Sequence, residues 1–183
     1  MAIMSEEEPI TLKEVQLRLG VPQHVLIHLC EKGVVEPDFA ETSGRGKRRE
    51  FSHRNLFEFA VALALRRFEL PVAMAALVVR VVRSFARAVG TAVPGFSLPD
   101  SLVEREIELA LHFYDGDLLV LAVRGGSFRK PLFLGAKTGG PSQASDARPR
   151  VSKLDDLPAD FDARLELNLA GIARKIMKQS LSE

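Results

Sequence analysis

The strongest constraint on the fold comes from two short helical patterns that only a Gly-Val-Pro turn separates. The first begins at Thr11, a good N-cap residue with Glu14 three residues later, as a capping box requires. Gly20 can take the left-handed conformation that ends a helix, and Pro22 suits the first turn of the next one. Apolar residues at helical spacing mark the buried faces: Leu12, Val15 and Leu19, then Val25, Leu26 and Leu29. The sequence therefore predicts two packed helices, the second running to about Lys32.

A basic loop follows the second helix. The segment from Thr42 to Arg54 holds five basic side chains and one acidic one, a balance of +4, whereas the first sixty residues hold eight basic and ten acidic ones, or −2. The basic residues are Arg45, Lys47, Arg48, Arg49 and Arg54. This order of parts is the plan of a winged helix-turn-helix, whose second helix enters the major groove and whose wing contacts the DNA backbone. A solvated surface turn is the alternative interpretation of the basic loop.

Two longer helices are predicted next. Ser52 is a good cap for a third helix over about His53 to Phe68, and Pro71 opens a fourth that stops near Val89. Residues 90–100 contain two prolines and two glycines and predict a linker. We therefore expect a flexible lead-in over residues 1–9 and a winged helix-turn-helix domain over residues 10–89.

The second half of the chain changes to a strand-like period. Ile107, Leu109, Leu111 and Phe113 alternate with polar or small residues, and Asp115-Gly116 is a hairpin turn signal. Further strands are predicted at 118–123, 131–136 and 165–169, a loop at 138–149, and a last helix after Asn168. The predicted fold class is α+β: a mostly α winged domain with a short β-wing, then a small domain (residues 101–183) of antiparallel strands plus a terminal helix.

The first part of the chain resembles the MerR-like family of transcription regulators over roughly residues 10 to 80. The matching residues are Thr11, Val15, Leu19-Gly20-Val21, Leu26, Gly33-Val34-Val35, Pro37, Arg49-Glu50-Phe51-Ser52, Asn55-Leu56 and Leu70-Pro71. The resemblance implies a homodimer on double-stranded DNA, with the second helix in the major groove. Where the family usually carries arginine and paired tyrosines, this helix carries His24, Ile27, His28 and Leu29. Gln23 and His24 are then the candidates for polar contacts with bases.

The predicted function is that of a sequence-specific transcription regulator. The predicted DNA-binding residues are Gln23, His24, Ile27, His28, Arg45, Lys47, Arg48, Arg49 and Arg54. Residues 101–183 would serve dimerisation, an effector or a protein partner. The alternative is a protein–protein interaction module, or an antitoxin or phage-type accessory protein, with a repurposed helix-turn-helix, because bidentate arginine contacts are missing from the second helix.

Other classes of function find little support in the sequence. His24 and His28 share a helix face, but no third metal ligand is evident, and Asp115 and Asp117 are explained by the turn between them. No nucleophile–base pair has a recognisable signature, so we expect no enzyme, no metal and no cofactor. The acidic start of the chain lacks the pattern of a signal peptide, and the most apolar segment, Leu70 to Val82, is too short to span a bilayer. A cytoplasmic protein without membrane contact is expected.

Overall fold

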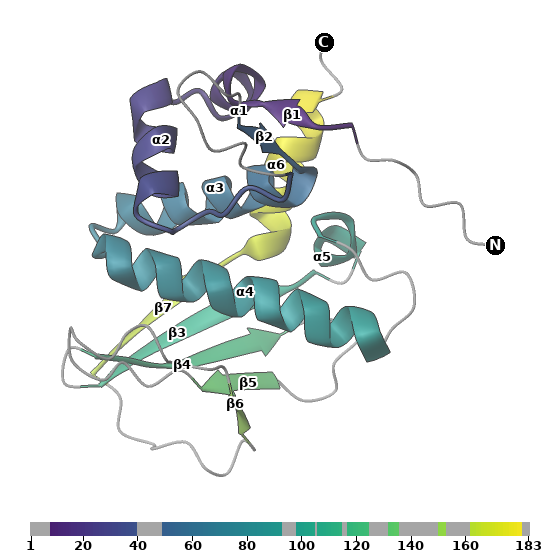
Figure 1. Ribbon diagram of the computed structural model, residues 1–183. Helices are drawn as coiled ribbons and strands as arrows, with labels where there is room; N and C mark the ends of the chain where they lie inside the picture. Colours follow the sequence, from purple (N-terminus) through teal and green to yellow (C-terminus); the bar gives the residue numbers. More distant parts are fainter. Residues whose placement is uncertain are drawn as a thin grey trace.

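The computed structural model describes residues 8–39, 49–92, 98–104, 106–114, 117–124, 132–135, 150–152 and 162–180. Side chains are described in 8–39, 49–87, 98–104, 106–113 and 162–178. Over these residues the fold is α+β, with six helices, one two-stranded sheet and one five-stranded sheet, both antiparallel. Figure 1 shows most of the helices gathered above the five-stranded sheet, with α4 (Val72–Ala92) running across the boundary.

The first two helices form where local signals predicted them. Helix α1 (Leu12–Leu19) begins with a capping box between Thr11 and Glu14, and it ends at Gly20, whose φ of 62° lies in the left-handed region. Helix α2 (Gln23–Glu31) starts after the turn and buries Leu26 and Leu29 completely. The three-residue connection between them is confirmed.

Strands β1 (Ile10–Thr11) and β2 (Glu50–Phe51) pair before the third helix, with Ile10 opposite Phe51. Helix α3 (His53–Arg67) then begins at Ser52, whose side chain accepts a hydrogen bond from the Asn55 backbone. Helix α4 does not stop near Val89, since it continues to Ala92 and takes up the first residues of the predicted linker. The next element is helix α5 (Asp100–Glu104), which was not predicted. Residues 93–97, between α4 and α5, lie outside the described residues.

The five-stranded sheet has the strand order β6-β5-β4-β3-β7. Its strands are β3 (Glu108–Tyr114), β4 (Asp117–Arg124), β5 (Leu132–Gly135), β6 (Arg150–Ser152) and β7 (Ala163–Leu167). The predicted hairpin joins β3 and β4, although its tip, Asp115-Gly116, lies outside the described residues, as does the predicted loop at 138–149. Strand β6 was not predicted. The chain ends in α6 (Leu169–Ser180), close to the expected helix start at Asn168.

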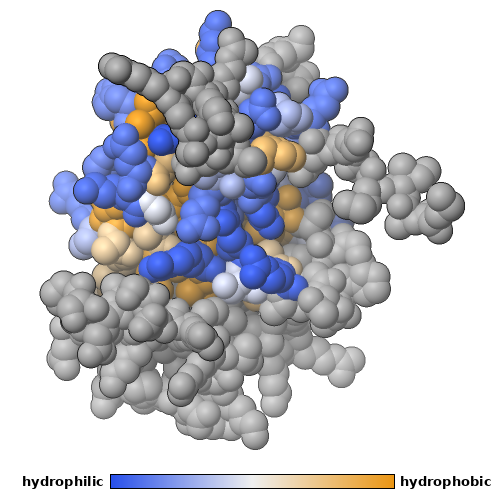
Figure 2. All heavy atoms as spheres, viewed as in Figure 1, coloured by the Kyte–Doolittle hydropathy of each residue, from blue (hydrophilic) through white to orange (hydrophobic). Residues whose placement is uncertain are grey.

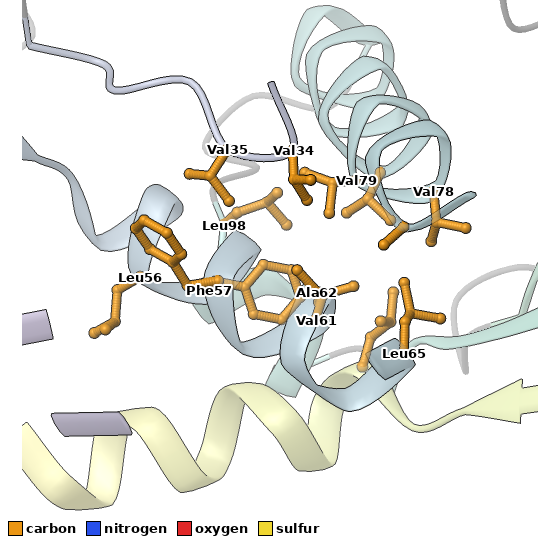
Figure 3. Packing of buried hydrophobic residues seen from close by; sticks show 14 of the residues in the cluster. Val34, Val35, Leu56, Phe57, Val61, Ala62, Leu65, Val78, Val79 and Leu98 are labelled. Atoms are coloured by element: carbon orange, nitrogen blue, oxygen red, sulfur yellow. The ribbon is translucent and has the colours of Figure 1, made fainter. Parts of the chain in front are cut away.

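One continuous apolar core joins the two halves of the chain. Helix α6 packs against α1, α3, α5 and strand β3, and its buried residues Leu169, Ala173 and Ile176 belong to the same cluster as Val15 and Leu26. Figure 3 shows Val61 and Leu65 of α3 facing Val78 and Val79 of α4 within this core. The helical part and the sheet are therefore packed together over the described residues.

The length and apolarity of the helices bear on membrane insertion. Among the residues that the structure describes, no helix is both long and apolar enough to cross a bilayer.

Candidate nucleic-acid interface

Helix α2 presents one open face. Gln23 and His24 are exposed, and Ile27 and His28 are partly exposed, whereas Leu26 and Leu29 on the opposite side are fully buried. Residues four positions apart share a helix face, so Gln23 lies beside Ile27 and His24 beside His28, and the two pairs form adjacent rows on the side of α2 away from Leu26 and Leu29. The N-cap residue, Pro22, makes no side-chain cap hydrogen bond to the first backbone N–H groups of α2.

The open face of α2 carries little positive charge. Neither lysine nor arginine occurs between Gln23 and Glu31, and the exposed Glu31 adds a negative charge at the C-terminal end of the helix. Figure 2 shows hydrophilic side chains gathered between α2 and α4 on the face in view, with apolar side chains in smaller areas. Any attraction to phosphate near α2 must therefore come from neighbouring segments.

The basic loop is that neighbouring segment. Arg45, Lys47 and Arg48 lie outside the described residues, and Arg49, which is partly exposed, directly precedes β2. Strand β2 is held by its pairing with β1 and by Phe51, which is fully buried and contacts Phe59 of α3 edge-on, with 5.3 Å between ring centroids. The end of the loop is thus attached to the core.

The start of the loop is held by Asp38. Arg54 donates to both carboxylate oxygens of Asp38, with an Nε–Oδ2 distance of 3.0 Å, and the Ser52 hydroxyl donates to Oδ2 as well. Asp38 precedes residues 40–48, which lie outside the described residues, and Ser52 and Arg54 follow them, so these contacts bring the two flanking segments together. Arg54, which we predicted to contact DNA, pairs its guanidinium with Asp38 instead, although its side chain stays 39% exposed.

Asn55 links the two ends further. Its buried Oδ1 accepts hydrogen bonds from the backbone N–H groups of Asp38 (2.8 Å) and Ser52 (3.2 Å). Its Nδ2 donates to the backbone carbonyl of Glu36 (2.9 Å) and to Oε2 of Glu58 (2.9 Å). All the hydrogen-bonding capacity of this amide is therefore used between the segment that follows α2 and the first turns of α3.

Glu58 and Arg83 extend these contacts to α4. Arg83 donates to the fully buried Glu58 carboxylate through Nε (2.7 Å) and Nη2 (2.5 Å), and it donates to the Glu36 carbonyl (2.9 Å) and carboxylate (3.2 Å). We call Glu36, Asp38, Ser52, Arg54, Asn55, Glu58 and Arg83 the anchor network. The anchor network joins the segment after α2, with Glu36 and Asp38, to helices α3 and α4.

The pKa values of the charged residues in the anchor network depend on burial and on hydrogen bonding. Burial alone would raise the pKa of Asp38, but hydrogen bonds from Arg54 and Ser52 outweigh it and hold that pKa below its usual value. Burial raises the pKa of Glu58, and the contacts with Arg83 and Asn55 oppose that rise only in part. Hydrogen bonding to Glu58 raises the pKa of Arg83 and keeps it charged.

The anchor network was not predicted from the sequence. Asp38, Glu58 and Arg83 were assigned no role, and Asn55 entered only as part of a family resemblance. The available signal was that Glu58 interrupts an otherwise apolar stretch, Leu56–Val61, near the start of α3, and that Asn55 directly precedes this stretch. Buried polar groups require partners, but a sequence does not show which distant residues supply them.

Metal binding finds no support in the described part of the chain, which contains no group of three or more His, Cys, Asp or Glu side chains placed to hold an ion. The chain was also compared with known proteins. No protein-family model and no curated protein sequence matches it.

Proposed function

We propose that the protein is a cytoplasmic, sequence-specific DNA-binding transcription regulator of the MerR-like winged helix-turn-helix type, acting as a homodimer. The observation that carries this proposal is the way in which the segments on either side of the basic loop are held. These segments are fastened by the anchor network and by the β1–β2 pairing, directly after a helix whose outer face is polar and open. The described residues on either side of the loop, Asp38 and Arg49, are thus held in a constant relation to α2.

In the proposed complex the basic loop and helix α2 make different kinds of contact with DNA. Arg45, Lys47, Arg48 and Arg49 contact phosphates, which supplies affinity without sequence information. Helix α2 enters the major groove, where Gln23 can pair with adenine and His24 can donate or accept at a base edge. Arg54 acts indirectly, since its ion pair with Asp38 holds the start of the loop beside the end.

The test is duplex binding as a function of salt. A library of random duplexes first selects the preferred sequence, and fluorescence anisotropy then measures affinity across a salt series. Replacing Arg48 and Arg49 together by alanine should reduce the slope of log affinity against log salt by about 2, because about two phosphate contacts are lost. The matched control removes two charges from α6 with Arg174→Ala plus Lys175→Ala, and we expect it to leave the slope nearly unchanged.

Two outcomes would contradict the proposal. The wild-type protein could bind no duplex in a salt-sensitive way, or the Arg48 and Arg49 double variant could keep the wild-type slope. Circular dichroism of each variant establishes that the fold is retained, so a lost affinity can be assigned to the loop.

A second candidate function is a protein-interaction module. It is favoured by the outer face of α2, which lacks basic residues and includes the partly exposed Ile27. In that case Ile27→Glu would abolish recovery of one stoichiometric partner from nuclease-treated lysate, whereas the Arg48 and Arg49 double variant would retain it. DNA binding that survives Ile27→Glu, with no partner recovered, would exclude this candidate.

A further inference from the structure

Strand β7 combines an edge position in the sheet with an alternation of apolar and charged side chains. Strand β7 lies at the end of the strand order, and among the described residues no strand lies beside its outer edge. Leu165 and Leu167 register with Leu111 and Leu109 on the core side of the sheet. Leu167 is buried, but Leu165 is only partly buried, although its register partner Leu111 is fully buried. An edge strand whose apolar side chains are only partly buried can pair with another strand.

The opposite side of β7 carries charges of both signs. Arg164 and Glu166 are exposed, and within one chain they form an ion pair with each other. Ala163 at the start of the strand is exposed and small, whereas Leu167 at the other end is large. The five residues Ala-Arg-Leu-Glu-Leu are therefore self-complementary about the central Leu165. The residues on either side of it, Arg164 and Glu166, carry opposite charges, and the two outer residues, Ala163 and Leu167, are small and large.

We propose that the protein forms a dimer by antiparallel pairing of β7 with β7 of a second copy, with the two-fold axis at Leu165. In this register Leu165 meets Leu165, each Arg164 lies opposite the Glu166 of the other copy, and each Ala163 lies opposite a Leu167. Directly opposed charges of unlike sign stabilise an antiparallel pair, and a small residue leaves room for a large one. The two five-stranded sheets would become one continuous ten-stranded sheet.

Charge selects this register over its neighbours. A two-fold axis at Arg164 would place Arg164 against Arg164 and Asp162 against Glu166, and an axis at Glu166 would oppose two glutamates. Like charges that are directly opposite destabilise a strand pair. Axes that fall between residues would place a charged residue opposite Leu165 and bring it to the core side of the sheet. The occupant that fits this edge is therefore a second copy of the same chain.

Sedimentation velocity over a concentration series, without DNA, tests this pairing. Arg164→Glu and Glu166→Arg each place like charges opposite one another, and each should weaken self-association by about tenfold or more. An equimolar mixture of the two variants restores unlike charges at both contacts and should associate as the wild type does. The intrachain ion pair remains broken in both variants, so its loss cannot produce this recovery. Lys175→Glu on α6 is the control for a charge reversal elsewhere.

The proposal concerns self-association and does not depend on DNA binding. A wild-type protein that stays monomeric at about 0.5 mM would overturn it, as would a dimer that neither reversal weakens, or a mixture that fails to associate. Amide hydrogen exchange gives a second measurement, because residues 163–167 should become more protected as the wild-type concentration rises. Unchanged exchange in a confirmed dimer would place the interface elsewhere.

Discussion

Asn55 shows how one side chain can connect segments that are far apart in the sequence. Its amide satisfies two backbone donors, one backbone acceptor and one carboxylate, and none of its surface is exposed. Buried polar groups contribute specificity only when every partner is present, because an unsatisfied group in the interior costs about 1–3 kcal/mol. At the residue scale, the fixing of the segments on either side of the basic loop thus depends on a few fully satisfied polar groups rather than on apolar packing alone.

Asp38 makes this dependence measurable through pH. Its pKa is lower in the folded protein than in the unfolded chain, so the unfolded chain takes up the proton first as the pH falls. The stabilisation is therefore complete above the unfolded value and is lost as the pH falls through the folded pKa. Asp38→Asn should lower the free energy of unfolding by about 1–2 kcal/mol near neutral pH, and the difference should shrink at about pH 3.

Urea unfolding at both pH values measures this effect. Glu104→Gln removes an exposed carboxylate of α5 and serves as the control, with little expected effect at either pH. A destabilisation by Asp38→Asn that stays constant down to acid pH would show that the carboxylate charge has no part in holding the loop.

At the scale of elements, the helix starts and the end of α1 follow local rules, but the end of α4 does not. The capping boxes at Thr11 and Ser52 are present where we expected caps, because each cap is formed by residues within a few positions of one another. The end of α4 was predicted near Val89, but the helix includes Gly90 and Thr91. Glycine lowers helix propensity only modestly, so its presence alone does not end a helix.

Gly20 provides the element-scale prediction. It closes α1 with a positive φ, and a Cβ added there would meet no atom within 4 Å, so only the backbone conformation opposes a side chain. Gly20→Ala should cost about 1 kcal/mol of stability, measured by urea unfolding. Gly20→Asn should cost less, because asparagine tolerates the left-handed region. Equal losses for the two variants would point to a cause other than the backbone conformation.

At the scale of the whole molecule, α6 connects the end of the chain to its beginning. This helix follows the five-stranded sheet in sequence but packs against α1 and α3, which precede the sheet. Its buried residues share one core with the helices around the basic loop. A change in α6 should therefore affect the stability of the helical part as well as that of the sheet.

Ile176→Ala tests this coupling. Ile176 is 3% exposed, and its truncation should lower the free energy of unfolding by about 2–4 kcal/mol. Far-UV circular dichroism and amide exchange in α3 should report the same loss, because the shared core predicts one cooperative transition. The neighbouring Met177, which is 36% exposed, is the control, and Met177→Ala should cost much less. Undiminished protection in α3 of the Ile176→Ala protein would contradict a shared core.

The sequence by itself determined the features whose signals are local. These are the α1–turn–α2 unit, the caps, the alternation in β3 and the concentration of positive charge between residues 42 and 54. Only the tertiary structure decided that Arg54 binds Asp38, that Arg83 reaches Glu58 and Glu36, and that α6 lies on α3. The reason is physical: caps and periodic faces arise within a few residues, whereas Arg83 meets partners 25 and 47 positions away. Such pairs exist only after the helices have packed.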